Sequence, residues 1–458
     1  MIGSTQSPGR ALALLLGCSL VAPAFAAPED VARLGQDLTC LGAEKAGNAD
    51  GSIPAFSGKW LGVPPHVDFK GTGNHPVDPY PDEKPLFVIT AQNMAQYAEQ
   101  LSDGQKALFK LYPATYKMPV YPSHRDFRFA DSVCQASREN AKVARLVDDG
   151  EGVVGKTGGT AFPVPRSGLE LLKNASAFTI RAWTEEYVSD NAYVLKDGNI
   201  NWGRVHSRNL APGLEPGKIG ETTGNSSFYL NETLLPQRDK GEINTGTEFW
   251  NDKTEPRQAW RYDPGTRRVR QSPGYGFDMS FPGSGGSLTV DEVRLFNGSG
   301  QRYDWKIVGK REMYIPYNTY RLHSANLKYA DLLTPGHINP DALRFERHRV
   351  WELEGTLKPG YRHLYGKRKL YIDEDTWFPM LADNYDNRGE LWRTSMLNFF
   401  YAYETQRPQA GVGLYYDLNA GSYLAFNLIN EQRNGYQLNK TGFSPKDFGP
   451  EAARRFGQ

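Results

Sequence analysis

Consecutive acidic residues are the part of this chain whose types and spacing come nearest to catalysis. Asp373, Glu374 and Asp375 form one cluster, and Asp383 with Asp386 forms a second, both at the ends of expected strands. Two carboxylates that face each other can act as acid and nucleophile in glycoside hydrolysis. The same residues are typical of turns beside a hairpin, which is the interpretation we favour. A hydrolase that uses these strand-end carboxylates is the alternative function.

A phosphate-binding pattern also occurs. Gly150–Thr157 reads GEGVVGKT and matches G-x-x-x-x-G-K-[ST] letter by letter. The pattern binds phosphate only between a buried strand and the start of a helix. Here the preceding residues are expected to be helical, and Gly158, Gly159, Pro163 and Pro165 prevent a helix afterwards. We therefore expect no nucleotide ligand.

Other catalytic and metal-binding patterns are weak. Phe281–Gly286 comes nearest to a G-x-S-x-G nucleophile elbow, but it is a glycine-rich loop with the wrong spacing. His337, His348 and His363 are too far apart in the sequence to form a pair of metal ligands on one helix. We expect no catalytic residue, no metal site and no cofactor from these patterns.

The amino-terminal residues predict export from the cytoplasm. Arg10 is followed by an apolar run, Ala11–Ala22, and by an A-x-A cleavage site, Ala24–Ala26. We expect a signal peptide over residues 1–26, cleavage after Ala26 and a mature protein in the periplasm. Leu15–Cys18 also resembles a lipobox, so a lipid anchor at Cys18 is the alternative.

Cysteine content fits an oxidising compartment. Cys18 lies within the expected signal peptide, which leaves Cys40 and Cys134. Two cysteines in such a compartment most often pair, and we predict a disulfide between Cys40 and Cys134. Two buried free thiols are the alternative.

Charge and hydropathy exclude several partners. The 53 Lys and Arg residues fall by one when Arg10 is removed and then equal the 52 Asp and Glu residues. A neutral chain gives no support for binding to nucleic acid or to anionic lipid surfaces. Beyond the signal peptide, no apolar run reaches the 18 residues of a membrane-spanning helix.

Local patterns divide the mature chain into four segments. We expect an irregular strap over 27–89, a helical segment over 90–150, antiparallel strands over 151–438 and a polar tail over 439–458. The strands follow from a period of two, as where Tyr303, Trp305 and Ile307 alternate with charged residues.

Many strands that each expose one face to solvent predict an α+β fold that is mostly antiparallel β. The expected architecture is one large curved sheet that is covered on its other side by helices, with the amino-terminal strap over the core. A curved sheet with aromatic side chains makes a trough for an apolar ligand. The expected ligand-binding side chains are aromatic residues on predicted strands: Trp183, Phe228, Trp260, Trp305, Trp351 and Trp392.

Several segments read together resemble one bacterial family, DUF1329. They are Leu38–Asn48, Gly51–Gly58, Tyr116–Pro122, Phe162–Pro165, Trp260–Arg270 and Tyr371–Asp373. The resemblance implies a fold similar to the periplasmic lipoprotein carriers of the LolA/LolB type. That fold is a half-open antiparallel β-barrel with a helical lid over an apolar cavity. It also implies association with resistance-nodulation-division (RND) transporters and outer-membrane partners. The family supplies no catalytic residues to carry over.

These expectations combine into one functional prediction. The protein is expected to be a periplasmic carrier or binding protein for a hydrophobic ligand, such as a lipid, a lipoprotein acyl chain or a sterol-like compound. It is expected to work with an envelope transporter. Binding would rest on burial of apolar area, at about 25 cal/mol per Å².

Overall fold

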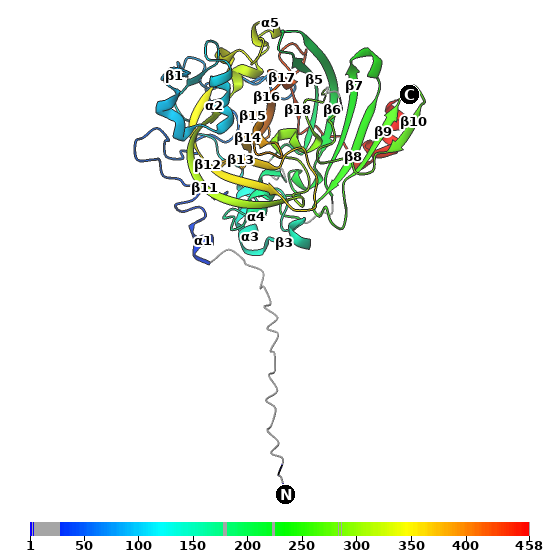
Figure 1. The fold of residues 1–458 in the computed structure, drawn as a ribbon, viewed down its shortest axis with the longest axis horizontal. Helices are drawn as coiled ribbons and strands as arrows, with labels where there is room; N and C mark the ends of the chain where they lie inside the picture. The colour runs from blue at the N-terminus through cyan, green and yellow to red at the C-terminus, as the bar shows by residue number, and fades with distance from the viewer. Residues whose placement is uncertain are drawn as a thin grey trace.

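The computed structural model describes Met1, Gly3 and residues 28–176, 181–221, 225–282, 284 and 286–457. The predicted cleavage site and Cys18 lie outside the described residues. Most of the described chain belongs to one curved antiparallel sheet with helices around it (Figure 1). No helix in the described ranges has the length and apolar character needed to cross a membrane.

Two meanders build the sheet. The first contains β5 (Thr184–Val194), β6 (Ile200–Leu210), β7 (Asn225–Leu235), β8 (Ile243–Phe249), β9 (Gln258–Asp263) and β10 (Arg268–Gln271). The second contains β11 (Tyr303–Pro316), β12 (Phe345–Leu357), β13 (Lys367–Asp373), β14 (Pro379–Tyr385), β15 (Leu391–Ala402), β16 (Arg407–Asp417) and β17 (Ser422–Leu428).

Antiparallel pairing of β5 with β17 joins the meanders, with Tyr423 opposite Val194. The outer strands β10 and β11 each pair with one neighbour, so the sheet is open. The predicted mostly antiparallel, curved and open sheet is therefore confirmed.

Shorter strands extend or flank this sheet. β1 (Phe87–Thr90) pairs with β2 (Lys117–Val120), which meets the start of β12 at Phe345. β18 (Gln437–Leu438) pairs with the start of β5. β3 (Arg145–Val147) and β4 (Gly152–Val154) form a separate pair.

The helices are short. The α-helices are α1 (Pro28–Arg33), α2 (Asp103–Leu111), α3 (Asp131–Val143), α4 (Gly168–Ser176), α5 (Tyr329–Leu332) and α6 (Gly449–Phe456). The 3₁₀ turns are η1 (Met94–Gln100), η2 (Asp148–Gly150), η3 (Pro212–Leu214), η4 (Gln237–Asp239), η5 (Val290–Leu295), η6 (Tyr320–His323), η7 (Pro340–Ala342) and η8 (Pro445–Asp447). The sequence predicts that α3 continues to about Val147, but it ends at Val143 because β3 pairs with β4.

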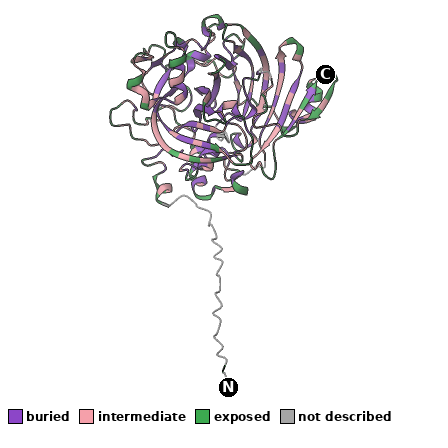
Figure 2. Cartoon of the chain, viewed as in Figure 1, coloured by how far each residue is buried: buried purple, intermediate pink, exposed green. Residues whose placement is uncertain are grey.

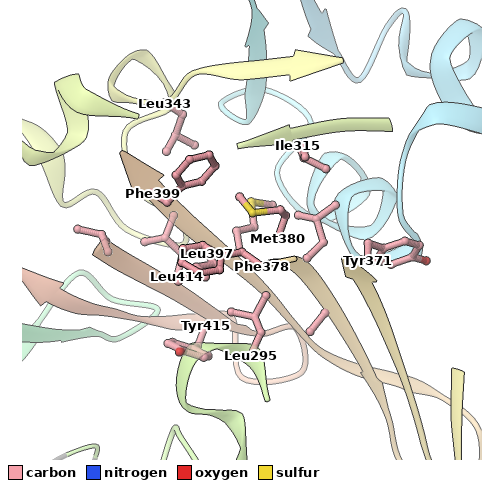
Figure 3. Packing of buried hydrophobic residues seen from close by; sticks show 14 of the residues in the cluster. Leu295, Ile315, Leu343, Tyr371, Phe378, Met380, Leu397, Phe399, Leu414 and Tyr415 are labelled. Atoms are coloured by element: carbon pink, nitrogen blue, oxygen red, sulfur yellow. The ribbon is translucent and has the colours of Figure 1, made fainter. Parts of the chain in front are cut away.

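Buried residues gather along the strands, while the loops and outer edges are exposed (Figure 2). The largest core joins the second meander to α2 and α4. Figure 3 shows Met380, Leu397 and Leu414, from three neighbouring strands, packed together. In α2, Ser102 and Gln105 form a capping box that starts the helix, and Leu108 and Phe109 point into the core.

The predicted disulfide between Cys40 and Cys134 is present. It ties the amino-terminal strap to α3. The strap also lies against the second meander, since the Trp377 indole donates a hydrogen bond to the Leu41 carbonyl. The strap is thus a fixed part of the structure.

Removing this disulfide is predicted to destabilise the protein. The bridge closes a loop across a sequence separation of 94 residues. The double variant Cys40→Ser/Cys134→Ser should lose about 4–5 kcal/mol of unfolding free energy on the chain-entropy model. Urea unfolding of the oxidised protein and the variant measures this difference. A loss under about 1 kcal/mol would contradict a stabilising role.

His323 of η6 is held in its neutral form within the core. Its Nδ1 donates to the Thr319 carbonyl at 2.8 Å, and its Nε2 accepts from the Val412 amide at 3.0 Å. Burial lowers the pKa of His323 to about 4. Gly411 leaves space for the ring, because a Cβ there would lie 1.9 Å from Nε2.

Acid is predicted to destabilise the fold through His323. In the unfolded chain the imidazole binds a proton near pH 6.5, whereas in the folded protein it does not bind this proton until about pH 4. This residue should therefore remove about 3 kcal/mol of stability as the pH falls through that window. Urea unfolding at several pH values should give this slope for the wild type and not for His323→Gln. Equal slopes would contradict the assignment.

Candidate functional site

A cavity that opens to solvent, with about 900 Å³ of space including its mouth, lies on one face of the first meander. Strands β5 to β8 and β17 form one wall, and the segment 275–297 forms the other. Its polar lining comprises Asn191, Ser207, Asn209, Ser227, Asn231, Asn297, Asn427, Tyr187, Tyr229 and Tyr275. Its apolar lining comprises Val205, Phe281, Val290, Val293 and Phe426.

Strand alternation decides which side chains reach the cavity. In β7, Ser227, Tyr229 and Asn231 line it, whereas Phe228 and Leu230 belong to a second core that includes α6. Successive residues of a strand point to opposite faces. The sheet wall of the cavity is therefore mainly polar, and the apolar face of β7 is buried under the carboxy-terminal helix.

A bulge in β17 supplies two further lining residues. The β5–β17 register shifts between Ala425 and Leu428, and Asn427 has a positive φ of 65°. The Asn427 amide donates to Asn191 Oδ1 at 3.0 Å, in place of a backbone acceptor. The bulge thereby allows both Phe426 and Asn427, although consecutive, to line the cavity.

The segment 275–297 covers the cavity and is anchored to the second meander. Phe281 meets Phe426 edge to face, with ring centroids 5.5 Å apart. The Arg294 backbone amide donates to the Tyr415 hydroxyl at 3.1 Å. No residue of the helical segment 90–150 is among those lining the cavity, so this loop and η5 cover it instead.

Buried charge inside the cavity is mainly positive. Arg257 pairs with Glu248 at 3.0 Å, and Arg294 pairs with Glu185 at 3.1 Å. Burial opposes the charge on both arginines, but these carboxylates outweigh it and raise the pKa of each. For Arg181, burial lowers the pKa and Glu185 offsets this only in part. The lining includes these three arginines together with Glu248.

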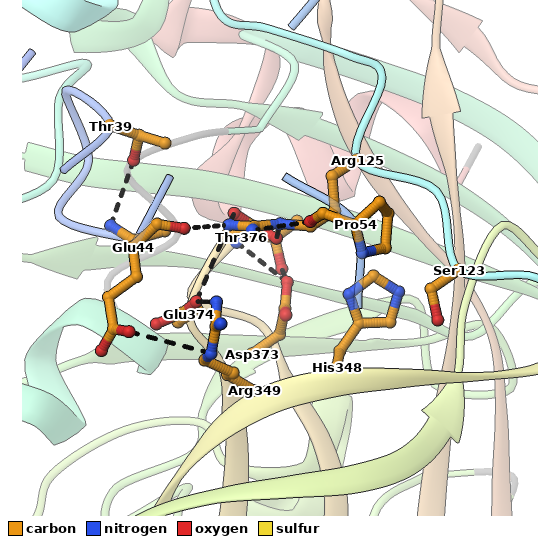
Figure 4. A network of polar contacts seen from close by, with 12 residues as sticks. Thr39, Glu44, Pro54, Ser123, Arg125, His348, Arg349, Asp373, Glu374 and Thr376 are labelled. Atoms are coloured by element: carbon orange, nitrogen blue, oxygen red, sulfur yellow. Dashed lines mark hydrogen bonds and ion pairs between the residues drawn. The ribbon is translucent and has the colours of Figure 1, made fainter. Parts of the chain in front are cut away.

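The acidic cluster at the β13–β14 turn is buried and lies away from this cavity (Figure 4). Arg125 holds Asp375 through two contacts, at 2.7 and 2.8 Å. Lys310 pairs with Glu374 at 3.0 Å. Burial and the charge of Asp375 raise the pKa of Asp373 to about 7. These residues do form a turn beside a hairpin, and the strap packs beside this turn, where Arg125 donates to the Glu44 and Pro54 carbonyls.

The second acidic pair has two separate roles. Asp383 is buried and accepts hydrogen bonds from the Gly104 amide at the start of α2 and from the Thr394 hydroxyl. Asp386 lies in the β14–β15 turn, where its Oδ1 accepts from the Arg388 and Glu390 amides. The two carboxylates therefore do not form a shared site.

The six predicted ligand-binding aromatics lie outside the cavity lining. Trp183 and Phe228 belong to the second core, and Trp305 and Trp351 pack against the main core. The Trp392 indole donates to Asp417, and Trp260 lies on β9 opposite Thr245. Ligand binding through these six side chains stays a prediction. The sequence signal for the cavity was instead in β7, where Ser227, Tyr229 and Asn231 alternate with the apolar Phe228 and Leu230.

These features define a class of protein with an open antiparallel sheet and a covered cavity whose sheet wall is mainly polar. The chain belongs to the DUF1329 family of proteins of unknown function, whose model matches residues 88–454, as the resemblance implied. An uncharacterized protein of Pseudomonas aeruginosa is 40% identical over 454 residues, which cover 97% of both chains.

Two solved structures are similar at low sequence identity. A DUF1329 family protein from Desulfovibrio piger is 14% identical, with a TM-score of 0.40, over 59% of this chain and 92% of its own. A LolA superfamily protein from Nitrosomonas europaea is 13% identical, with a TM-score of 0.36, over 63% of this chain and 100% of its own.

Loss of Arg125 is predicted to destabilise the acidic cluster. Its side chain is buried and pairs with both oxygens of Asp375, so Arg125→Met leaves a mostly buried carboxylate without this partner. The expected cost is about 3–5 kcal/mol of unfolding free energy, with little recovery in Arg125→Lys because lysine lacks the two-pronged geometry. Exposed Arg128 is the control, and Arg128→Met should cost under about 0.5 kcal/mol in urea unfolding. Equal costs would contradict this role.

Proposed function

We propose that this protein is a periplasmic carrier or binding protein for a hydrophobic ligand, such as a lipid, a lipoprotein acyl chain or a sterol-like compound. The observation that carries the proposal is the cavity between the sheet and the segment 275–297, which polar and apolar side chains line together. Sites for small organic ligands are concave and combine apolar walls with a few polar groups that orient the ligand.

The lining supports a ligand with an apolar body and a polar end. Phe281, Phe426 and Val293 offer apolar contacts, whereas asparagine and serine side chains of β6 and β7 offer hydrogen bonds. A fatty acid or another amphiphile has this combination of features.

The proposal also includes the cellular compartment and the partner protein. The apolar run and A-x-A site before Pro28 support export, and the disulfide is compatible with an oxidising compartment. The family resemblance is the support for a partnership with an RND-type transporter or an outer-membrane protein. A carrier in this place would move its ligand between membranes.

Paired substitutions in β7 test the proposed cavity. Asn231→Trp places an indole in the cavity, whereas the adjacent Glu232 lies on the opposite face, near His206. Binding of a fluorescent fatty acid should weaken at least about tenfold in Asn231→Trp, equivalent to about 1.4 kcal/mol, and should be unchanged in Glu232→Trp.

Organic extraction of the purified mature protein, followed by mass spectrometry, tests for a native ligand in the same samples. The proposal expects a stoichiometric apolar compound from the wild type and from Glu232→Trp, and much less from Asn231→Trp. Folded wild-type protein that yields no such compound and binds no probe would contradict a carrier function. Equal probe binding by both variants would place the ligand elsewhere.

A further inference from the structure

The turn between β13 and β14 brings one histidine and two aspartates together. His348 of β12 and Asp373 of β13 are completely buried, and Asp375 has a side-chain exposure of 11%. Each offers one ligand atom, and these atoms lie within 4.8 Å of one another. Three atoms that share one ion at about 2.0–2.2 Å lie about 3.3–3.8 Å apart, so side-chain adjustments of up to about 1.5 Å bring these atoms into binding distance.

One atom of His348 and one of Asp373 are held in place, while the other atom of each has no hydrogen-bond partner within the described ranges. His348 Nε2 contacts Glu346 at 3.1 Å, and its Nδ1 is the orphan. Asp373 Oδ2 accepts from the Tyr317 hydroxyl at 3.1 Å and from Thr376, and its Oδ1 is the orphan. Metal ligands are commonly oriented in this way, through the atom that does not bind the metal.

Within the cluster, basic side chains pair with Asp375 and Glu374 but not with Asp373. Arg125 pairs with Asp375, and Lys310 and Arg349 pair with Glu374. Among the residues that the structure describes, Asp373 has no ion-pair partner. A fully buried carboxylate is stable only when it is paired, bound to a metal or neutralised by a proton. Figure 4 shows the imidazole of His348 beside this carboxylate.

We propose that His348 Nδ1, Asp373 Oδ1 and a carboxylate oxygen of Asp375 bind a divalent first-row metal ion, Zn²⁺ or Mn²⁺. One imidazole and two carboxylates form a mixed nitrogen and oxygen donor set, which suits these ions better than Cu⁺. Asp375 shares its oxygens between the ion and Arg125, because each carboxylate oxygen has two lone pairs.

A second cavity, which Asp375, Thr376 and Tyr317 help to line, lies beside the site and gives the ion a route to it. Three protein ligands leave at least one coordination position for water or another small ligand. The histidine spacing did not predict this site because its ligands come from one strand and from the turn after the next strand, rather than from one helix.

Metal titration of the chelator-treated mature protein tests the proposal. Calorimetry with Zn²⁺ and with Mn²⁺, together with elemental analysis, should give one bound ion per chain for at least one metal. His348→Phe and Asp373→Asn should weaken binding by about 100-fold or more, since each removes a ligand. His206→Asn and Asp386→Asn, which alter a histidine and a carboxylate outside the cluster, should bind as the wild type does.

A measurement on the wild type alone tests the proposal even if the variants fail to fold. Co²⁺ added to the chelator-treated protein should give visible d–d absorption bands, which Zn²⁺ should abolish stoichiometrically. Folded wild-type protein that binds neither Zn²⁺ nor Mn²⁺ in a one-to-one ratio overturns the proposal and leaves a proton as the neutralising species. Binding that His348→Phe and Asp373→Asn retain at full strength also overturns it.

Discussion

Antiparallel pairing of β5 with β17 is the interaction on which the rest of the molecule depends. The two meanders are otherwise sequential, and this pairing alone makes them one sheet in the part of the chain that the structure describes. It also creates the bulge that brings Phe426 and Asn427 to the cavity. Because strands 230 residues apart must meet, the cavity wall forms only when both meanders are in register.

The second constraint is the alternation of side chains along each strand. One face of β7 is buried under α6 with Phe228 and Leu230, and the other presents Ser227, Tyr229 and Asn231 to the cavity. A shift of one residue would exchange these faces. The same rule gives the two faces of β7 different roles, since the apolar face packs against the helix and the polar face lines the cavity.

Local chemistry made much of the fold predictable from the sequence, whereas the site depended on long-range contacts. The period of two indicated the antiparallel strands, and the compartment indicated the Cys40–Cys134 pair. The cavity was harder to predict because tryptophans are prominent in the sequence, whereas the polar residues that line the cavity are not. His348 and Asp373 meet only through the pairing of β12 with β13, which residue spacing did not reveal.

The central claim is that the space between the first meander and the segment 275–297 holds an amphipathic molecule. The most direct test is a crystal structure of the protein purified from the periplasm of its producing cells without denaturation. The account predicts continuous non-protein electron density between Tyr229 and Phe281, with a polar end near the arginines. A cavity that contains only ordered water would contradict it.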